Sequence, residues 1–238
     1  MKKSFLLSAL AGLVLSFQAQ AANIERVRVT TNLGAFVVEM QRDRAPLTVE
    51  NFLSYVKSGQ YTNTLFHRAI ANFVVQGGGV GPDYKSKPVQ KPIANEAGNG
   101  LKNLRATVGL ARASGPHSGD CQFYVNVADN ADLDPLPTRW GYAVFGKVIE
   151  GMEVVDRISI SPTGSMGPFK QDAPLQPVVI QKVELLTDGN ATAPAAAPAA
   201  TAPAAAPAEA PPAANPATPV TPATTPPAEP ASGAPPPK

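Results

Sequence analysis

The sequence predicts a mainly β domain, and it favours a β-barrel whose ends are closed by helices. Three observations lead to this prediction. Eight short runs have β-type residues, two segments carry apolar residues at helical spacing, and residues 22–188 are long enough for one domain with a sizeable core. Closing the strands into a barrel would leave no exposed sheet edge.

The β-type runs begin with a hairpin. Residues 27–31 and 35–40 flank the turn-forming sequence Asn32-Leu33-Gly34. The remaining runs combine β-branched, aromatic and other apolar residues over strand-like lengths. They are residues 65–70, 73–76, 107–111, 122–127, 142–149 and 178–186.

Two segments have the pattern of helices. Residues 46–58 begin with Pro46, which suits a first helical turn, and are followed by Gly59, which suits a helix end. Residues 152–160 form a shorter helix with Met152 on its apolar stripe. The apolar positions that recur at helical spacing are Val49, Phe52, Leu53 and Val56 in the first segment and Met152, Val155 and Ile158 in the second.

The first 21 residues have the organisation of a signal peptide. Lys2 and Lys3 form a basic start, residues 5–17 are an apolar run too short to span a bilayer, and residues 19–21 form a small-x-small cleavage site. We therefore expect cleavage after Ala21. The short leader is typical of bacterial export, so we predict a periplasmic location, with secretion beyond it as the other possibility.

Residues 189–238 are predicted to be a disordered tail. From residue 191 onward they are almost entirely Ala, Pro and Thr, and they contain 15 of the 26 prolines. Such a segment buries too little apolar surface to offset its ordering entropy, and its prolines oppose a helix. The alternative is that the tail is a ligand for an unknown partner or a cell-wall structure.

Charge and cysteine content exclude several classes of function. Loss of Lys2 and Lys3 with the leader leaves 18 basic and 18 acidic residues, so no basic surface for nucleic acid is expected. Cys121 is the single cysteine, so no intramolecular disulfide can form. Its strand-like surroundings favour a core or rim position over a nucleophile, and no metal-ligand spacing is present. We expect no cofactor and no metal.

Residues 66–78, Phe-His-Arg-Ala-Ile-Ala-Asn-Phe-Val-Val-Gln-Gly-Gly, are the most informative stretch. Alternation in an extended chain could direct Arg68, Ile70, Val74 and Gln76 at one surface, past a turn at residues 71–72. Removing an unpaired guanidinium from water into apolar surroundings costs free energy. An arginine at this position therefore suggests a functional role. This stretch resembles the signature of the cyclophilins, which are peptidyl-prolyl cis-trans isomerases.

Three further blocks resemble the same family in the same order. Residues 109–113 are similar to the strand whose backbone holds the substrate, residues 122–130 to the segment that lines the proline pocket, and residues 141–156 to a late strand and the closing helix. The resemblance is strongest to exported bacterial members. It implies an eight-stranded antiparallel barrel with two capping helices and a site that needs no covalent step.

The resemblance also implies roles for individual residues. Arg68 would be the catalytic donor, and Gln76 would help to hold both Arg68 and the substrate carbonyl. The substrate would contact the proline pocket, its rim and the neighbouring peptide backbone. The implied substrate-binding residues are Phe73, Val74, Ala111, Arg112, Ala113, Gln122, Tyr124, Leu133 and Tyr142.

Without the family, these residues have simpler interpretations. Phe73, Val74 and Leu133 could be core residues, Gln76 could cap the glycine turn that follows it, and Arg68 could pair with an acid. His67 is expected to make a structural hydrogen bond, because isomerisation transfers no proton. Three positions depart from the family pattern: Tyr124 replaces a Phe, Asp132 replaces a rim aromatic, and Tyr142 replaces a His common in eukaryotic members.

The resemblance to the cyclophilins implies two alternative functions. The first is a monomeric peptidyl-prolyl isomerase that acts on proline-containing, unfolded or flexible exported proteins and assists their folding. The alternative is a chaperone or binding scaffold with the same fold, in which turnover is incidental. Neither requires stable membrane insertion.

Overall fold

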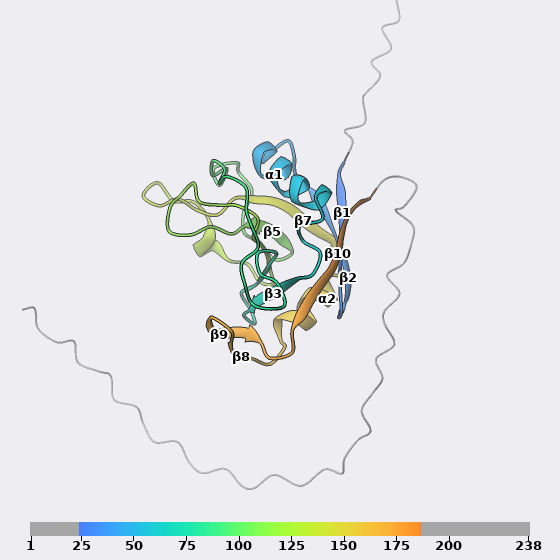
Figure 1. Cartoon of the computed structure of the whole chain (residues 1–238). Coiled ribbons are helices and arrows are strands. Elements are labelled where there is room, and N and C mark those ends of the chain that lie inside the picture. The colour runs from blue at the N-terminus through green and yellow to red at the C-terminus, as the bar shows by residue number, and fades with distance from the viewer. Residues whose placement is uncertain (1–23, 187–238) are drawn as a thin grey trace, which may run out of the picture. The chain divides into compact units, whose positions relative to one another are not determined.

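The computed structural model describes residues 24–186, which form a closed antiparallel barrel with a helix at each end (Figure 1). Hydrogen-bonded strands follow one another in the order β1-β10-β3-β4-β6-β5-β7-β2. The strands of the barrel are β1 (Arg26–Thr31), β2 (Gly34–Met40), β3 (Thr64–Ala69), β4 (Val74–Gly77), β5 (Thr107–Leu110), β6 (Phe123–Asn126), β7 (Val144–Glu150) and β10 (Val178–Leu186).

The predicted eight-stranded barrel and its two helices are confirmed. The helices are α1 (Pro46–Lys57) and α2 (Met152–Ser159), and a 3-10 turn, η1, spans Ala131–Leu133. Figure 1 shows α1 over one end of the barrel and α2 toward the other. No helix within residues 24–186 is long and apolar enough to cross a bilayer. The predicted leader (1–21) and the predicted tail (189–238) lie outside the described residues.

One element was missed from the sequence. Strands β8 (Thr163–Met166) and β9 (Phe169–Pro174) pair as a separate two-stranded sheet that lies outside the barrel order. The hairpin packs against β3, where the rings of His67 and Phe169 stack with centroids 4.9 Å apart. It therefore lies next to the strand that carries Arg68.

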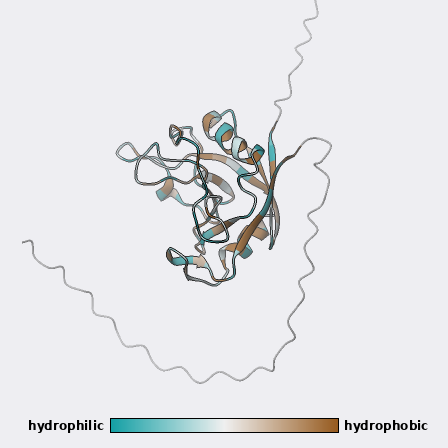
Figure 2. Ribbon diagram, viewed as in Figure 1, coloured by the Kyte–Doolittle hydropathy of each residue, from teal (hydrophilic) through white to brown (hydrophobic). Residues whose placement is uncertain are grey.

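The core fills the barrel interior with aromatic rings. Phe52, on the buried face of α1, packs within 5.1 Å of the ring centroids of Tyr61 and Phe145 and edge-on to Phe123 at 5.5 Å. Figure 2 shows apolar residues running along the strands, whereas the long connecting loops are more polar. Protein interiors are close-packed, and these rings fill the inside of the barrel, so no room for a ligand is left there. A ligand is therefore expected on the outer face.

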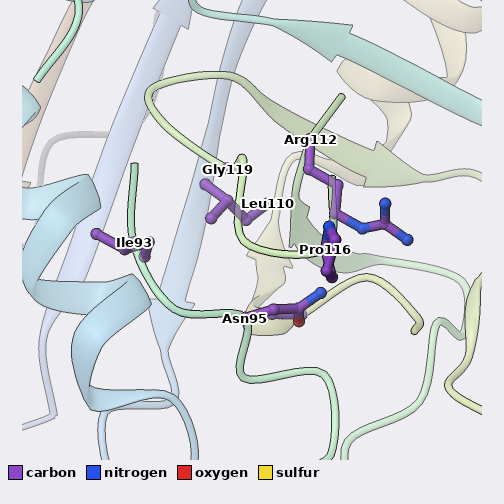
Figure 3. Close-up of a pocket in the computed structure, with 7 residues that line it drawn as sticks. Ile93, Asn95, Leu110, Arg112, Pro116 and Gly119 are labelled. Carbon is purple, nitrogen blue, oxygen red and sulfur yellow. The ribbon is translucent and has the colours of Figure 1, made fainter. Parts of the chain in front are cut away.

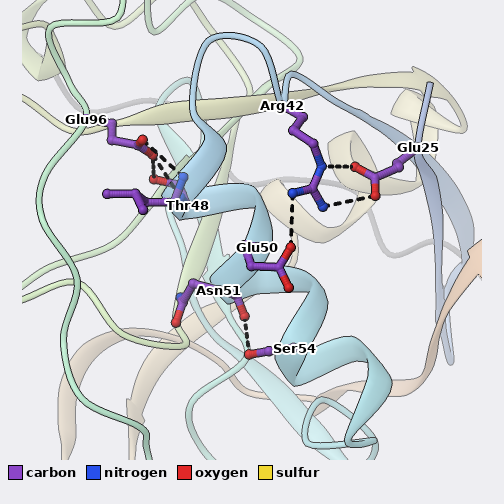
Figure 4. Close-up of polar contacts among 8 residues, drawn as sticks. Glu25, Arg42, Thr48, Glu50, Asn51, Ser54 and Glu96 are labelled. Carbon is purple, nitrogen blue, oxygen red and sulfur yellow. Dashed lines mark hydrogen bonds and ion pairs between the residues drawn. The ribbon is translucent and has the colours of Figure 1, made fainter. Parts of the chain in front are cut away.

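The start of α1 depends on a residue from a distant loop. Ala45 at the N-cap has no side-chain oxygen to accept the free N–H groups of the first turn. Instead, the Glu96 carboxylate accepts hydrogen bonds from the N–H groups of Leu47 (3.1 Å) and Thr48 (2.8 Å), and from the Thr48 hydroxyl at 2.6 Å (Figure 4). A carboxylate here also interacts favourably with the helix dipole.

The carboxylate of Glu50, on α1 itself, has a different environment. Arg42 joins Glu25 and Glu50 through ion pairs of 2.6 and 3.0 Å (Figure 4). The Glu50 side chain is 61% exposed. Exposed ion pairs contribute little because water screens them and both side chains must be ordered.

We predict that Glu96→Ala destabilises the domain because it leaves the first turn of α1 without acceptors. The free energy of unfolding should fall by about 1–2 kcal/mol. Urea denaturation followed by circular dichroism measures this change. The matched variant Glu50→Ala should lose less than about 0.5 kcal/mol. Equal losses in the two variants would contradict the capping role of Glu96.

Candidate active site

The predicted site residues surround a cavity on the outer face of the barrel. Alternation along β6 explains this placement, because Phe123 points into the core and the next residue, Tyr124, points to the opposite face. The cavity has a volume of about 220 Å³. It is lined by Arg68, Phe73, Val74, Gln76, Ala111, Arg112, Tyr124, Leu133 and Tyr142.

A second cavity of about 220 Å³ adjoins the first and shares Gln76, Ala111 and Arg112 with it. It contains the two remaining predicted residues, Ala113 and Gln122. The structure thus brings all the predicted site residues together. Sequence reasoning did not find Ser118 and Asp120, which also line the second cavity.

A β-bulge directs Arg68 toward the first cavity. Phe66 pairs with Gly77 and Arg68 pairs with Gln76, so His67 is an extra residue on β3. Phe66 points into the core, whereas His67 and Arg68 both contact groups outside the barrel. The bulge therefore places two successive side chains on the outside of the strand.

Three side chains form a polar row across β3, β4 and the start of β6. Arg68 Nη1 lies 3.4 Å from Gln76 Oε1, and Gln76 Nε2 donates to Gln122 Oε1 at 3.0 Å. This arrangement commits the Gln76 carbonyl oxygen to Arg68 and its amide nitrogen to Gln122. The guanidinium keeps further N–H groups that can donate to a ligand in the cavity.

The opposite side of the first cavity is apolar. Val74, Ala111 and Tyr124 form a small buried cluster separate from the barrel core, and three half-buried side chains pack against it. Those side chains are Phe73, Leu133 and Tyr142. Phe73, Val74 and Leu133 therefore belong to this smaller cluster and not to the one that fills the barrel.

The hydroxyl of Tyr124 has a partner beneath the cavity. It donates a 2.6 Å hydrogen bond to Asn103 Oδ1, and Asn103 is 1% exposed. Burial raises the pKa of Tyr124 well above its ordinary value, so the hydroxyl remains a donor at neutral pH. A Cβ on Gly109 would overlap the Tyr124 ring, so the glycine on β5 leaves the space that the ring occupies. The departure at Tyr124 thus leaves no unpaired hydroxyl in the cavity.

Buried asparagines extend this support, and sequence reasoning missed them. Asn126 Nδ2 donates to Asn103 Oδ1 at 3.2 Å, and Asn130 Nδ2 donates to the carbonyl of Phe73 at 2.9 Å. Asn103 Nδ2 in turn donates to Asp134 Oδ1 at 3.0 Å. Buried polar groups that are fully bonded rigidify their surroundings. This cluster therefore fixes the backbone of Phe73 and the ring of Tyr124.

Arg112 connects the strand end after β5 to the loop that precedes β7. Its guanidinium donates to the carbonyls of Trp140 (2.9 Å) and Gly141 (3.2 Å), and it lies 4.4 Å from the centroid of the Tyr142 ring. Figure 3 shows Arg112 beside a gap lined by Asn95 and Pro116. That gap has a volume of about 10 Å³, which is room for a single water at most.

Other residues considered in the sequence lie away from the cavities. Ile70 and Asp132 do not line either cavity, and Asp132 lies exposed on η1. Cys121 is fully buried, as expected for a core residue, and burial raises its pKa to about 12. Among residues 24–186, no group of three His, Cys, Asp or Glu side chains could hold a metal ion.

His67 is buried beside Arg68 and stays neutral. Its pKa is lowered to about 4, chiefly by burial and to a smaller extent by the Arg68 charge, while a hydrogen bond with the Leu65 backbone partly opposes the shift. Its Nδ1 is buried without a hydrogen-bond partner in the described part of the chain. His67 contributes a flat ring that stacks on Phe169 rather than a charge.

Comparisons with known proteins agree with this fold. The family model for cyclophilin type peptidyl-prolyl cis-trans isomerases matches residues 26–185. The chain is 50% identical over 163 residues to peptidyl-prolyl cis-trans isomerase cyp18 of Streptomyces antibioticus, covering 67% of this chain and 98% of that protein. It is 47% identical over 156 residues to peptidyl-prolyl cis-trans isomerase B of Escherichia coli K12, covering 64% and 94%.

A solved structure shows the same fold. A cyclophilin type peptidyl-prolyl cis-trans isomerase of Cryptosporidium parvum, crystallised in the presence of the dipeptide Ala-Pro, is 27% identical with a TM-score of 0.59. The match covers 68% of this chain and 99% of that one. Barrel, site and relatives define a class of enzyme that acts on prolyl peptide bonds. The chain belongs to the cyclophilin-type peptidyl-prolyl cis-trans isomerase family.

We predict a pH-dependent loss of stability that depends on His67. Its pKa is lower in the folded protein than the ordinary value of 6.5. Protons therefore bind preferentially to the unfolded chain below pH 6.5, and stability falls until the folded pKa of about 4 is passed. The shift corresponds to a loss of up to roughly 3 kcal/mol.

The measurement is urea denaturation between pH 7 and pH 4. Carboxylates titrate in part of this range, so His67→Phe must be compared with the unmodified chain. The variant should lose markedly less stability across the interval, whereas His117→Gln should follow the unmodified chain. Identical curves for His67→Phe and the unmodified chain would show that His67 does not contribute.

Proposed function

We propose that this protein accelerates rotation about X-Pro peptide bonds in exported polypeptides and so assists their folding, with Arg68 as the catalytic residue. The single observation that carries the proposal is the division of the first cavity. One side presents the guanidinium of Arg68 held by Gln76, and the other is an apolar wall suited to a proline ring.

The chemistry follows from the electronic structure of the amide. Resonance between the prolyl nitrogen and the carbonyl gives a rotation barrier of roughly 18–20 kcal/mol. In the twisted transition state the nitrogen lone pair is no longer conjugated and can accept a hydrogen bond. A donor that reaches this nitrogen stabilises the transition state more than either planar ground state.

Arg68 is suited to this role because a guanidinium is always charged and has several N–H donors. Its neighbours support the role. Gln76 lies across the strand pair and restrains Nη1, and Phe73 lies 5.9 Å below the guanidinium carbon. Neutral His67 adds no second positive charge beside Arg68. Proton transfer plays no part in the step.

The apolar wall would hold the proline ring. Phe73, Val74, Leu133 and Tyr142 would contact the ring, while the row formed by Gln76 and Gln122 would contact the substrate carbonyl and the preceding residue. The backbone of residues 111–113 would hold the peptide. The second cavity would receive a side chain upstream of the proline.

The proposed setting is the bacterial periplasm. The signal-like residues 1–21 support export, and the near-neutral charge after their removal is compatible with polypeptide substrates. Fractionation of cells that express the full chain, followed by N-terminal sequencing, tests this part. A periplasmic product beginning at residue 22 is expected, and an uncleaved cytoplasmic product would refute export.

The experiment for the activity is the cis-to-trans rate of a short Xaa-Pro peptide. We predict that the signal-cleaved protein catalyses this reaction and that Arg68→Ala lowers kcat/KM about 10²–10³-fold, because it removes a donor used in the transition state. The matched variant Arg26→Ala loses only an exposed ion pair with Glu39 and should keep full activity. A folded but inactive parent protein would refute the isomerase proposal.

The alternative is a binding scaffold with incidental turnover, which the proline-rich residues 189–238 favour. Arg68→Ala separates the two functions in cells. If the variant loses the phenotype conferred by the unmodified gene, catalysis is required. If it restores the phenotype despite lacking activity, the scaffold function is the relevant one.

A further inference from the structure

The acid nearest to Arg68 belongs to the hairpin outside the barrel. Asp172 on β9 places Oδ2 3.9 Å from Arg68 Nε, and its side chain is 28% exposed. The same hairpin contacts the preceding residue of β3, because Phe169 stacks on His67. The bulge at His67 thus turns two successive side chains of β3 toward one hairpin.

Asp172 and Gln76 contact different edges of the Arg68 guanidinium. Nη1 lies near Gln76 Oε1 at 3.4 Å, whereas Nε faces Asp172. The ring of Phe73 lies against the guanidinium at 5.9 Å from its carbon. Arg68 is 40% exposed, so without these contacts its long side chain would populate several rotamers. Three contacts in different directions restrict the guanidinium plane.

The backbone of Asp172 is unusual for a residue within a strand. Its φ is +62°, a left-handed conformation that L-residues other than Asn and Asp seldom adopt. Glycine would accept this φ without strain but would bring no carboxylate. Asparagine accepts it with nearly the same shape and no charge. The position therefore allows the charge to be removed while the backbone is preserved.

We propose that Asp172 is a positioning residue for the isomerase reaction. Its carboxylate holds the Nε edge of Arg68 so that the Nη edge faces the proline cavity. The inference rests on the function proposed above for Arg68. Asp172 is not among the residues that line either cavity, so it acts through Arg68 and not by contact with substrate.

This role predicts a particular kinetic signature. The apolar wall that binds the proline ring is unchanged when the Asp172 charge is lost, so KM should stay within about twofold. The population of correctly directed Arg68 falls, so kcat falls. An exposed ion pair of this kind contributes up to about 1 kcal/mol, which corresponds to about a fivefold loss of kcat.

The test compares Asp172→Asn with Glu39→Gln. Glu39 forms an exposed ion pair with Arg26 at 3.0 Å on the strands β1 and β2, and it serves as the matched removal of one carboxylate charge. We expect Asp172→Asn to lower kcat about fivefold with little change in KM and in the urea midpoint. Glu39→Gln should match the unmodified chain in all three quantities.

A double-mutant cycle with Arg68→Lys identifies the route of the effect. Lysine lacks the Nε edge, so Asp172→Asn should cause little further loss of kcat in that background. The same fivefold loss in both backgrounds would overturn the proposal, as would full activity of Asp172→Asn. Asp172→Gly relieves the strain of the positive φ but lacks the carboxylate, so its kcat should equal that of Asp172→Asn. A higher kcat in the glycine variant would show that backbone strain, and not the lost charge, lowers the activity of Asp172→Asn.

The outcomes also separate this inference from the proposed function. Activity that collapses in Arg68→Ala but persists in Asp172→Asn would refute the role of Asp172 alone. Inactivity of the correctly folded unmodified chain would refute the isomerase proposal and remove the basis of this inference with it.

Discussion

The packing of aromatic rings inside the barrel is the constraint on which the rest of the structure depends. Phe52 enters from α1 and contacts the rings of Tyr61, Phe123 and Phe145, which leaves the interior filled. The cavities therefore lie on the outer face, and the first is lined in part by residues that alternate with the core residues. Tyr124 follows Phe123 directly, so a shift of β6 would disturb core and cavity together. The shape of the cavity is coupled to the stability of the fold.

Buried hydrogen bonds beneath the first cavity hold its walls in place. The Tyr124 hydroxyl, the Phe73 carbonyl and the buried Asn103 belong to one hydrogen-bonded cluster, and Asp134 completes it. Electrostatic stabilisation of a transition state is effective when donors and walls are in place beforehand, because no reorganisation is then required. The cavity combines walls fixed from below with a guanidinium held from the side. Under the proposed mechanism, this division would let a few residues catalyse a noncovalent step.

Much of the fold and site could be predicted from the sequence, and the misses have physical reasons. Runs of β-branched, aromatic and other apolar residues indicated the barrel strands, and Pro46 marked the start of α1, because these signals are local. The resemblance to the cyclophilins supplied Arg68 and Gln76, which pair across β3 and β4. The hairpin of β8 and β9 was missed because residues 163–174 lack an apolar alternation. Asn103 and Glu96 were missed because their partners are remote in sequence and a buried polar contact has no periodicity.

Cys121 can be used to measure local opening of the barrel. The thiol is fully buried and its pKa is raised to about 12, so the nucleophilic thiolate is scarce while the barrel is closed. As the single cysteine of the chain, it can be alkylated without ambiguity about the site. The rate at which an excess of alkylating reagent labels Cys121 would therefore measure how often the structure around the start of β6 opens locally. Equilibrium denaturation does not give the rate of such opening.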